Sequence, residues 1–361
     1  MRIKVLHTEW SDGWGGQEQR IIGEISLLKD KIDFYLACRK DSKILKKAKE
    51  IGIPIFILPF KNKFDFKTIF ELIKIIKNNE IDIVHTHSGI DTWIGGLASK
   101  IAGAKFIRTR HLSNPINKSR LNFINELADF IITTGESIKQ NMIKDNRINK
   151  NKIISIPTGQ DSNRFNPNRY NKLKSRQILN LPNDKIIIGN LAILRKFKRH
   201  DIFIKVAKKV TQKYQNVLFV IAGDGPQKDN LLKMIKEYQL EKNVKLIGFC
   251  NRPEIFLSSI DIFLFTSDSN EGVPQVLIQA LMMNLSVISS NVGSIKDLWH
   301  NNNFDLIDNY TIENFAKTVI KNLENPQKKD TREYMVKNFS TNIMAENILD
   351  VYNRVIKNGN I

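Results

Sequence analysis

Short apolar runs alternate along this chain with longer segments in which apolar residues recur at helical spacing. Short runs are typical of strands buried in a sheet, and the helical spacing is typical of helices that pack on the sheet by one face. In the first half, strands are predicted at 3–7, 34–38, 55–58, 81–84, 105–108, 128–134 and 153–156, and helices at 17–28, 43–51, 66–78, 95–102 and from 136 onward. In the second half, strands are predicted at 186–191, 217–222, 244–248, 262–265 and 285–289, and helices after 200, at 227–238 and from 274 onward. This alternation predicts an α/β fold of parallel strands with helices on both faces.

The strand–helix pattern starts afresh in the second half, and 361 residues suffice for two domains of ordinary size. We expect the first domain at 1–170 and the second at 171–338, with the polar segment 166–176 as the linker. The closing segment 339–361 is amphipathic and predicts a last helix.

The chain is strongly basic, with 56 Lys and Arg against 37 Asp and Glu, a net charge of +19 and a pI of 9.7. Such a balance suits a negatively charged partner: nucleic acid, an anionic membrane face or an anionic acceptor. The lysines are spread along helices, without a tight basic stripe interleaved with aromatic residues, so nucleic acid is the weaker inference. The charge therefore favours peripheral association with an anionic membrane.

Three further features bear on the compartment. No run of about 18 apolar residues is present, so no helix is expected to span a bilayer. The opening MRIKVLHTEW lacks the apolar segment and cleavage site of a signal peptide. Cys38 and Cys250 are far apart and form no C-x-x-C pair, which predicts neither a disulfide framework nor a zinc site. We expect a cytoplasmic protein that can associate with the inner face of the cell membrane.

The stretch 265–294 carries the strongest candidate chemistry. A strand ends at Phe265, a polar loop leads to Glu271, and Gly272-Val273-Pro274 opens a helix whose Gln275 and Gln279 share a polar face. A helix N-terminus favours a phosphate, whereas a carboxylate just ahead of it favours hydroxyl groups. A nucleotide sugar offers both. The alternative is that Glu271 only complements the helix dipole, and spacing alone does not separate the two interpretations.

A glycine loop and a basic loop each follow a predicted strand. Gly15 and Gly16 lie between the first strand and the first helix, the phosphate-binding layout of doubly wound sheets, although such a pair can be a simple tight turn. The loop is not G-x-G-x-x-G, and no acidic residue follows at the right distance, so a nicotinamide cofactor is disfavoured. Four cations crowd into 195–199 after another strand, and both Arg and Lys suit phosphate oxygens.

Histidines also gather at predicted strand ends. His85-x-His87 could bind a metal, but the sequence places no third ligand, and loop-anchoring hydrogen bonds are commoner, so no metal is predicted. His111 follows the predicted strand 105–108 closely; it could contact a ligand or cap a loop.

The segment EGVPQVLIQAL, residues 271–281, resembles the Glu-(seven residues)-Glu signature of retaining family-4, or group 1, glycosyltransferases of the GT-B fold. The match comprises Glu271, Gly272, Pro274 and Ala280, with Val292-Gly293 in the following turn. It departs at Gln279, where the family usually has a second glutamate. An amide can also hydrogen-bond hydroxyl groups, so the departure weakens the match at the nucleotide site more than at the reacting sugar.

The resemblance implies two Rossmann-like domains facing across a cleft, with the last helix crossing back to the first domain. It implies a retaining transfer of a sugar from a nucleoside diphosphate to a hydroxyl of a glycan or lipid-linked acceptor, in lipopolysaccharide or other cell-surface polysaccharide biosynthesis. Neither a metal nor another cofactor is implied, and the chain contains no D-x-D triplet.

The resemblance also implies roles for individual residues. Glu271 and His111 would lie at the reacting sugar and are the catalytic candidates. The donor-binding candidates hold the diphosphate, ribose and base: Gly15, Gly16, Arg195, Lys198, Phe249, Gly272, Val273, Gln275 and Gln279.

Two other functions stay open from the sequence. A non-hydrolysing nucleotide-sugar epimerase would share the fold but leave its product attached to the nucleotide. A basic nucleic-acid-binding protein would bind generic DNA in a salt-dependent way without affinity for nucleotide sugars.

Overall fold

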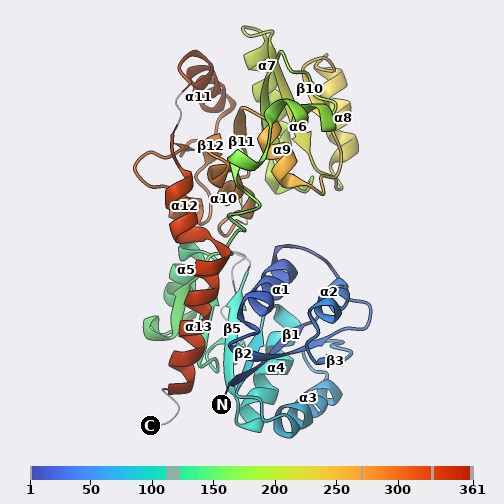
Figure 1. The fold of residues 1–361 in the computed structure, drawn as a ribbon, viewed down its shortest axis with the longest axis vertical. Coiled ribbons are helices and arrows are strands. Elements are labelled where there is room, and N and C mark those ends of the chain that lie inside the picture. Colours follow the sequence, from blue (N-terminus) through green and yellow to red (C-terminus); the bar gives the residue numbers. More distant parts are fainter. Residues whose placement is uncertain (1, 112–115, 117–121, 270, 327–328, 358–361) are drawn as a thin grey trace. The chain divides into compact units, whose positions relative to one another are not determined.

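The computed structural model describes residues 2–111, 116, 122–269, 271–326 and 329–357 (Figure 1). The chain divides into two compact units. Unit 1 is Met1–Gly159 together with Thr341–Ile361, and unit 2 is Gln160–Ser340. The sequence-based boundaries were 170 and 338, whereas these units meet at Gly159 and Ser340.

Unit 1 contains a seven-stranded parallel sheet in the order β3-β2-β1-β4-β5-β6-β7. Its strands are β1 (Ile3–Glu9), β2 (Ile32–Cys38), β3 (Ile55–Ile57), β4 (Ile83–Thr86), β5 (Lys105–Arg110), β6 (Phe130–Thr133) and β7 (Ile153–Ser155). Its helices are α1 (Gly16–Leu28), α2 (Lys43–Ile51), α3 (Phe66–Asn78), α4 (Gly89–Ala102), α5 (Glu136–Asn146) and α13 (Thr341–Lys357).

Alternation along the strands divides the unit 1 core into two faces. Val5 of β1 packs in one hydrophobic cluster with residues of α1, α2 and α13, whereas the next residue, Leu6, packs with residues of α3 and α4. Ile83 of β4 and Ile107 of β5 share the face of Val5. Every second residue after these three therefore points toward α1 and α13, and this is the face on which the polar cluster described below is built.

Unit 2 contains a six-stranded parallel sheet in the order β10-β9-β8-β11-β12-β13. Its strands are β8 (Ile186–Leu191), β9 (Val217–Ala222), β10 (Val244–Leu246), β11 (Ile262–Phe265), β12 (Ser286–Ser290) and β13 (Asp305–Ile307). Its helices are α6 (Lys172–Ile178), α7 (His200–Thr211), α8 (Lys228–Glu237), α9 (Pro253–Ser259), α10 (Gln275–Met282), α11 (Ile312–Glu324) and α12 (Arg332–Phe339). Both sheets carry helices on both faces, so the α/β architecture predicted from the alternation is confirmed.

Several sequence-based elements were wrong or missing. The helix predicted at 95–102 begins earlier, at Gly89. Ser88 is its N-cap residue and forms a capping box with Asp91, which stabilises the start of the helix at this point. The segment expected to be a linker, 166–176, instead contains a short 3₁₀ helix and most of α6, and its Arg176 is buried. Besides α6, four helices and strands of unit 2 were not predicted: α9, β13, α11 and α12.

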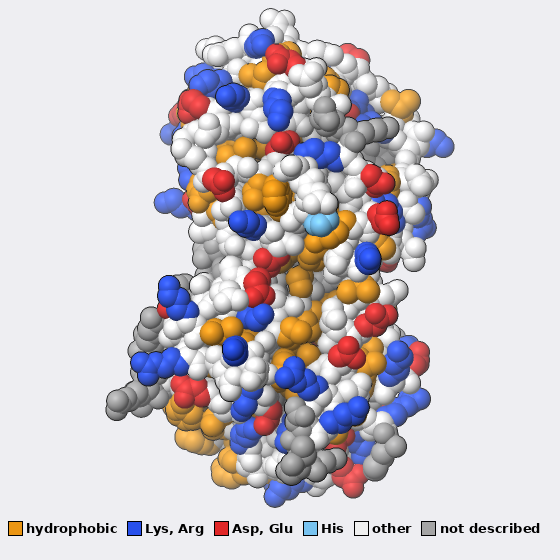
Figure 2. All heavy atoms as spheres, turned by 90° about the vertical axis from the view of Figure 1, so that its left-hand side faces the viewer, with side chains coloured by type: hydrophobic (Ala, Val, Ile, Leu, Met, Phe, Trp, Pro, Cys, Tyr) orange, Lys and Arg blue, Asp and Glu red, His pale blue; other side chains and the backbone are white. Residues whose placement is uncertain are grey.

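Two observations concern the membrane association expected from the sequence. None of the helices in the described part of the chain is both long and apolar enough to cross a bilayer. On the face drawn in Figure 2, Lys and Arg side chains are interspersed with Asp and Glu side chains and do not gather in one patch. The excess positive charge is therefore distributed on this face, which agrees with the lysines being spread along the sequence.

Candidate functional site

Unit 2 brings two polar loops together at the carboxyl edge of its sheet. One follows β8 and includes a 3₁₀ turn at Lys196–Lys198; the other follows β11 and leads to α10. Because β8 and β11 are hydrogen-bonded neighbours, their carboxyl ends lie side by side. The loops are tied directly, since the Thr266 hydroxyl donates to the backbone carbonyls of Lys198 and Arg199, at 3.1 Å each.

Lys198 and Glu271 form an ion pair at this edge. The Lys198 ammonium donates to Glu271 Oε1 at 2.6 Å, and the side chains are only 14% and 8% exposed. The Ser267 hydroxyl donates to the same oxygen at 2.5 Å. The carboxylate is thus oriented by two donors, one of them charged, and charge-assisted bonds of this kind are stronger than neutral ones.

A glycine fixes the backbone at Glu271. Gly293 has φ +59°, and a Cβ placed on it would lie 1.9 Å from the Glu271 carbonyl oxygen. No side chain can be accommodated there without displacing that backbone. The Val-Gly turn that matched the family pattern therefore packs directly on the residue that opens the signature.

Two of the four cations in the basic loop are paired with carboxylates, and two are exposed. Arg199 bonds to Asp201 at 2.9 Å and to Asp268 at 3.0 Å, and these bonds raise its pKa. Lys198 pairs with Glu271. Arg195 and Lys196 are exposed, and within the described residues neither side chain has a hydrogen bond or ion pair. Of the two diphosphate candidates, Lys198 is already paired with Glu271, whereas the Arg195 guanidinium is available to an anion.

Helix α10 begins one residue later than the sequence indicated. Pro274 occupies the N-cap position rather than the first turn. The polar face expected at Gln275 and Gln279 is present, because the Gln279 amide donates to Gln160 Oε1 at 2.7 Å and the Gln160 amide donates to Gln275 Oε1 at 3.1 Å. This row of amides, also within unit 2, is able to donate to and accept from ligand hydroxyls.

Two remaining unit 2 candidates differ in exposure. Val273 is buried in the core beneath α10, so only its backbone is placed to meet a ligand. Phe249 is 79% exposed just after β10. A large exposed aromatic ring at the carboxyl edge of a sheet is a suitable surface for stacking a nucleotide base.

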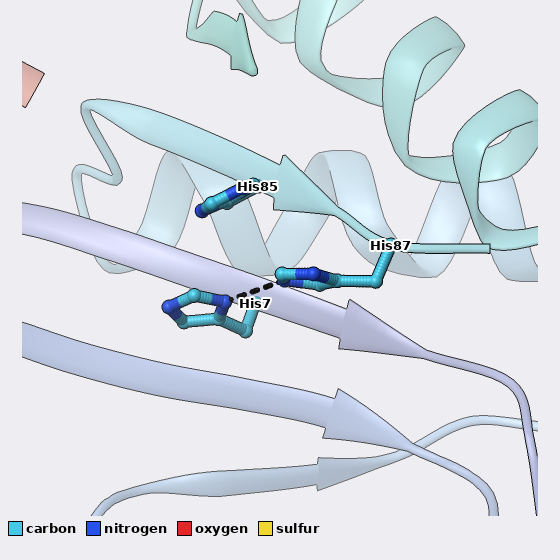
Figure 3. A group of neighbouring side chains, drawn as sticks. All are labelled: His7, His85 and His87. Atoms are coloured by element: carbon cyan, nitrogen blue, oxygen red, sulfur yellow. Dashed lines mark hydrogen bonds between the residues drawn. The ribbon is translucent and has the colours of Figure 1, made fainter. Parts of the chain in front are cut away.

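Unit 1 gathers four histidines at the carboxyl ends of β1, β4 and β5. His7 lies directly opposite His85 in the strand register. His7 Nδ1 and His87 Nε2 are 2.8 Å apart, and His87 Nδ1 and His111 Nε2 are 3.2 Å apart (Figure 3 shows the first pair). His7, His85 and His87 are buried, and His111 is half-buried. The sequence pointed to three of these residues; it missed His7, which lies inside the first strand.

A buried carboxylate lies beneath the histidines. Glu24 of α1 has its Oε1 atom 3.6 Å from His7 Nε2 and 3.5 Å from His85 Nδ1. The Tyr352 hydroxyl of α13 donates to the same oxygen. The Tyr352 hydroxyl oxygen also lies 2.8 Å from His85 Nδ1, and His85 Nε2 lies 2.7 Å from the Thr109 hydroxyl oxygen. Neither Glu24 nor Tyr352 was a sequence-based candidate, since each stands in an amphipathic helix with nothing local to mark it.

Burial and neighbouring charges set the ionisation of this cluster. Burial would raise the pKa of Glu24, but the hydrogen bond and charge of His85, the charge of His7 and the Tyr352 hydroxyl lower it to about 2. Burial lowers the pKa of His7 to about 3, against the opposing effect of Glu24. Burial and the neighbouring histidines lower the pKa of His87 well below its usual range. At neutral pH the cluster therefore combines an ionised carboxylate with neutral His7 and His87.

His7, His85 and His87 are close enough for a shared metal ion, with ligand atoms within 4.8 Å of one another. Their nitrogens are nevertheless engaged: both of His85, with Tyr352 and Thr109, and both of His87, with His7 and His111. Only His7 Nε2 lacks a hydrogen-bond partner. A metal would have to break several buried hydrogen bonds, so these residues fit a hydrogen-bonded network better than a metal site.

The Gly-Gly loop of unit 1 is a helix cap. The Gly15 N–H donates to Glu18 Oε2 at 2.7 Å, and α1 begins at Gly16. A Cβ on Gly15 would meet only that carboxylate, at an ordinary 3.5 Å. The close turn at this loop therefore does not require glycine at position 15, although the absence of a side chain leaves its backbone open.

Two family models match consecutive parts of the chain. The model described as Glycosyltransferase Family 4 matches residues 14–164, and the model described as Glycosyl transferases group 1 matches residues 171–340. The chain belongs to the group 1, family 4 glycosyltransferases. This confirms the family inferred from the signature at Glu271.

Curated relatives of this chain are distant. The GPI3 subunit of phosphatidylinositol N-acetylglucosaminyltransferase from Saccharomyces cerevisiae is 28% identical over 269 residues, 69% of this chain. That match spans only 58% of the yeast protein. The UDP-Gal:alpha-D-GlcNAc-diphosphoundecaprenol alpha-1,3-galactosyltransferase of Escherichia coli is 25% identical over 383 residues, covering 99% of this chain and 98% of that protein.

Solved glycosyltransferases share the fold along nearly the whole chain. A glycosyltransferase from Rickettsia africae has a TM-score of 0.91 at 21% identity, covering 99% of each chain. Anabaena HepE in complex with UDP-glucose has a TM-score of 0.82 at 19% identity, covering 98% of this chain and 100% of that one. The GT-B fold is confirmed.

Proposed function

We propose that this glycosyltransferase moves a sugar from a nucleoside diphosphate to a hydroxyl of a glycan or lipid-linked acceptor, with retention of configuration. The observation that carries the proposal is the carboxyl edge of the unit 2 sheet. There Lys198 and Glu271 form a buried pair, and Arg195, in the same loop as Lys198, is exposed and has no hydrogen-bond or ion-pair partner for its guanidinium among the described residues. A cation for phosphate and an oriented carboxylate for hydroxyl groups are the two features that a nucleotide sugar needs.

Each group has a role in this proposal. Arg195 and Lys198 neutralise the departing diphosphate, together with the backbone at Val273 and Gln275, so no metal ion is needed. Glu271 accepts hydrogen bonds from the sugar hydroxyls, and Gln279 holds the ribose. Phe249 stacks on the base. For residues of unit 1, the resemblance implies a contact of His111 with the sugar near the reacting carbon and a contact of Gly15 and Gly16 with the donor.

Names of related proteins support the donor and the acceptor class. HepE was solved with UDP-glucose, and the name of the Escherichia coli relative gives UDP-Gal as donor and a diphosphoundecaprenol-linked sugar as acceptor. By analogy we propose a lipid-linked acceptor in cell-surface polysaccharide biosynthesis, and therefore action at the cytoplasmic face of a membrane.

An exposed aromatic surface of unit 1 supports the membrane part of the proposal. Phe64, Phe66 and Phe70, at the start of α3, are 62%, 64% and 65% exposed. Lys61, Lys63 and Lys67 are interleaved with them in the sequence. Phenylalanine rings enter the headgroup boundary and lysines bind anionic headgroups, so this aromatic–lysine surface suits an anionic lipid bilayer.

The proposal is tested by product analysis. The chain is incubated with a panel of nucleotide sugars and with lipid-diphosphate-linked sugars as acceptors, with and without EDTA. We expect release of free nucleoside diphosphate, a new glycosidic bond whose anomeric configuration by NMR matches that of the donor, and equal rates in EDTA. A product still attached to the nucleotide would indicate an epimerase instead. An inverted linkage or loss of activity in EDTA would overturn the mechanism proposed.

A further inference from the structure

One chain of hydrogen bonds ends at Glu24 in the buried part of unit 1, and a second chain ends at His7, whose Nε2 lies close to the same carboxylate. One runs from Thr109 through His85 and Tyr352 to Glu24. The other links His111, His87 and His7, and His7 Nε2 faces the same carboxylate oxygen at 3.6 Å. In a series of neutral imidazoles each ring has one N–H and one bare nitrogen, so the group at one end fixes the tautomer of every ring.

The direction of the first chain follows from the carboxylate. An ionised carboxylate only accepts, so the Tyr352 hydroxyl must donate to Glu24. The Tyr352 oxygen then accepts from His85 Nδ1, which carries the proton. His85 Nε2 is left to accept from the Thr109 hydroxyl, at 2.7 Å. The neutral form of His85 that fits these hydrogen bonds is therefore the Nδ1–H tautomer.

The second chain runs in the same sense. A bare His7 Nε2 would set a lone pair against the Glu24 carboxylate in a buried site, whereas an N–H there is attracted to it. With Nε2 protonated, neutral His7 accepts at Nδ1, so His87 donates from Nε2. His87 then accepts at Nδ1, and His111 donates from Nε2. His7, His87 and His111 therefore all carry their proton on Nε2.

We propose that Glu24 is a positioning residue that acts through His7 and His87 to hold His111 as the Nε2–H tautomer, so that its bare Nδ1 accepts a hydrogen bond from a substrate hydroxyl. Within the part of the chain that the structure describes, the hydrogen bonds of His111 involve its Nε2 and its backbone carbonyl and leave Nδ1 without one. The ligand class is a hydroxyl donor, as a sugar is. Only the presence of a sugar at His111 rests on the proposed function; the tautomers themselves do not.

The tautomers can be measured in the full chain without substrate. Two-bond ¹H–¹⁵N correlation spectra of protein labelled in histidine distinguish Nδ1–H from Nε2–H, and single His→Gln variants assign the four rings. We expect Nε2–H at His7, His87 and His111 and Nδ1–H at His85. Finding Nδ1–H at His111 in the unmodified protein would overturn the proposal without any variant being needed.

A variant then tests the origin of the pattern. Glu24→Leu removes the acceptor at nearly the same volume, and we expect the tautomer ratio at His111 to move toward Nδ1–H by about tenfold, the effect of losing one charge-assisted contact. Tyr352→Phe is the matched control, because it removes a buried hydrogen bond to Glu24 but keeps the carboxylate; we expect His111 to be unchanged. An unaltered His111 in Glu24→Leu, or an equal shift in both variants, would overturn the proposal.

Because the spectra need no catalysis, the two proposals fail separately. Tautomers as expected in a chain that transfers no sugar would count against the proposed function alone. Active protein with His111 as Nδ1–H would count against the tautomer chain alone.

Discussion

The Lys198 ammonium lies 2.6 Å from Glu271 Oε1, and both side chains are largely buried. Removing one member of a buried pair leaves an uncompensated charge, which costs more than the pair itself contributes. The loops after β8 and β11 are therefore joined through the same two groups that we assign to the diphosphate and to the sugar. Ligand binding and local stability are consequently coupled at this position.

Glu271→Gln keeps the shape of the side chain and removes its charge. We expect sugar transfer to fall by about 10²-fold or more, because the Lys198 ammonium loses its charged partner and the sugar loses an acceptor. Initial rates at saturating donor measure the effect. Lys209→Gln is the control, since it breaks an exposed pair with Glu313 at 2.8 Å; exposed pairs contribute little, so its rate should stay near that of the unmodified chain. Equal rates in the two variants would refute the role of Glu271.

Gly293→Ala tests the backbone support of Glu271. The added Cβ would meet the Glu271 carbonyl oxygen at 1.9 Å and must adopt φ +59°, so we expect a loss of unfolding free energy of about 1–3 kcal/mol and impaired transfer. Gly23→Ala is the control: it lies within α1 with no atom within 4 Å of its Cβ, and helix propensity should make it neutral or slightly stabilising. Urea titration of both variants measures the change in unfolding free energy. An unchanged unfolding free energy in Gly293→Ala would contradict the packing of Gly293 on Glu271.

The histidine cluster makes stability depend on pH. The pKa of His7 is about 3 when folded, against 6.5 in the unfolded chain, so below pH 6.5 the unfolded chain binds a proton that the folded chain does not. Glu24 acts in the same direction at lower pH, because its folded pKa of about 2 lies below its ordinary 4.5. Stability from these groups is thus present at higher pH and is lost as pH falls, for His7 from about 6.5 toward 3.

His7→Phe should flatten this dependence. We expect a smaller loss of unfolding free energy between pH 6.5 and pH 4 in His7→Phe than in the unmodified chain, as measured by urea titration at each pH. His300→Phe, which changes an exposed histidine of unit 2, should keep the original slope. If the unfolding free energy of His7→Phe falls with pH as steeply as that of the unmodified chain, His7 is not neutral in the folded protein.

The aromatic–lysine surface should bind anionic lipid. We expect the triple variant Phe64→Ser, Phe66→Ser and Phe70→Ser to lose most of its cosedimentation with phosphatidylglycerol vesicles. The control replaces the exposed apolar residues Leu173, Ile178 and Leu232 of unit 2 with serine. Equal vesicle binding by both triple variants would place the membrane contact elsewhere.

Much of the fold followed from local pattern. The run at 217–222 is apolar throughout, and the run at 186–191 is apolar except at Gly189 and Asn190; structure and sequence agree on the bounds of both strands. Weak local signals explain most failures. Strand β13 has three residues, none of them buried, and its place at the sheet edge depends on pairing with β12. Helix α12 depends on contacts with α10 that periodicity cannot show.

Site residues could be predicted from the sequence only where they lie close together in a motif. Glu271 opens the signature, Gly293 lies in the turn that follows it, and the basic loop is a visible cluster of charge. The histidine network joins Glu24, His87 and Tyr352, which are separated by most of the chain, and Tyr352 reaches Glu24 because α13 packs on α1. Such a network is created by tertiary folding, so sequence spacing could not have identified it.

The most direct test of the central claim is isothermal titration of nucleotide sugars into the chain and into Arg195→Ala. We expect at least one nucleoside-diphosphate sugar to bind the unmodified chain and to bind Arg195→Ala at least tenfold more weakly, because the free guanidinium is the proposed anchor of the diphosphate. Absence of binding by any nucleotide sugar, or equal affinity in the two proteins, would contradict the donor site described for unit 2.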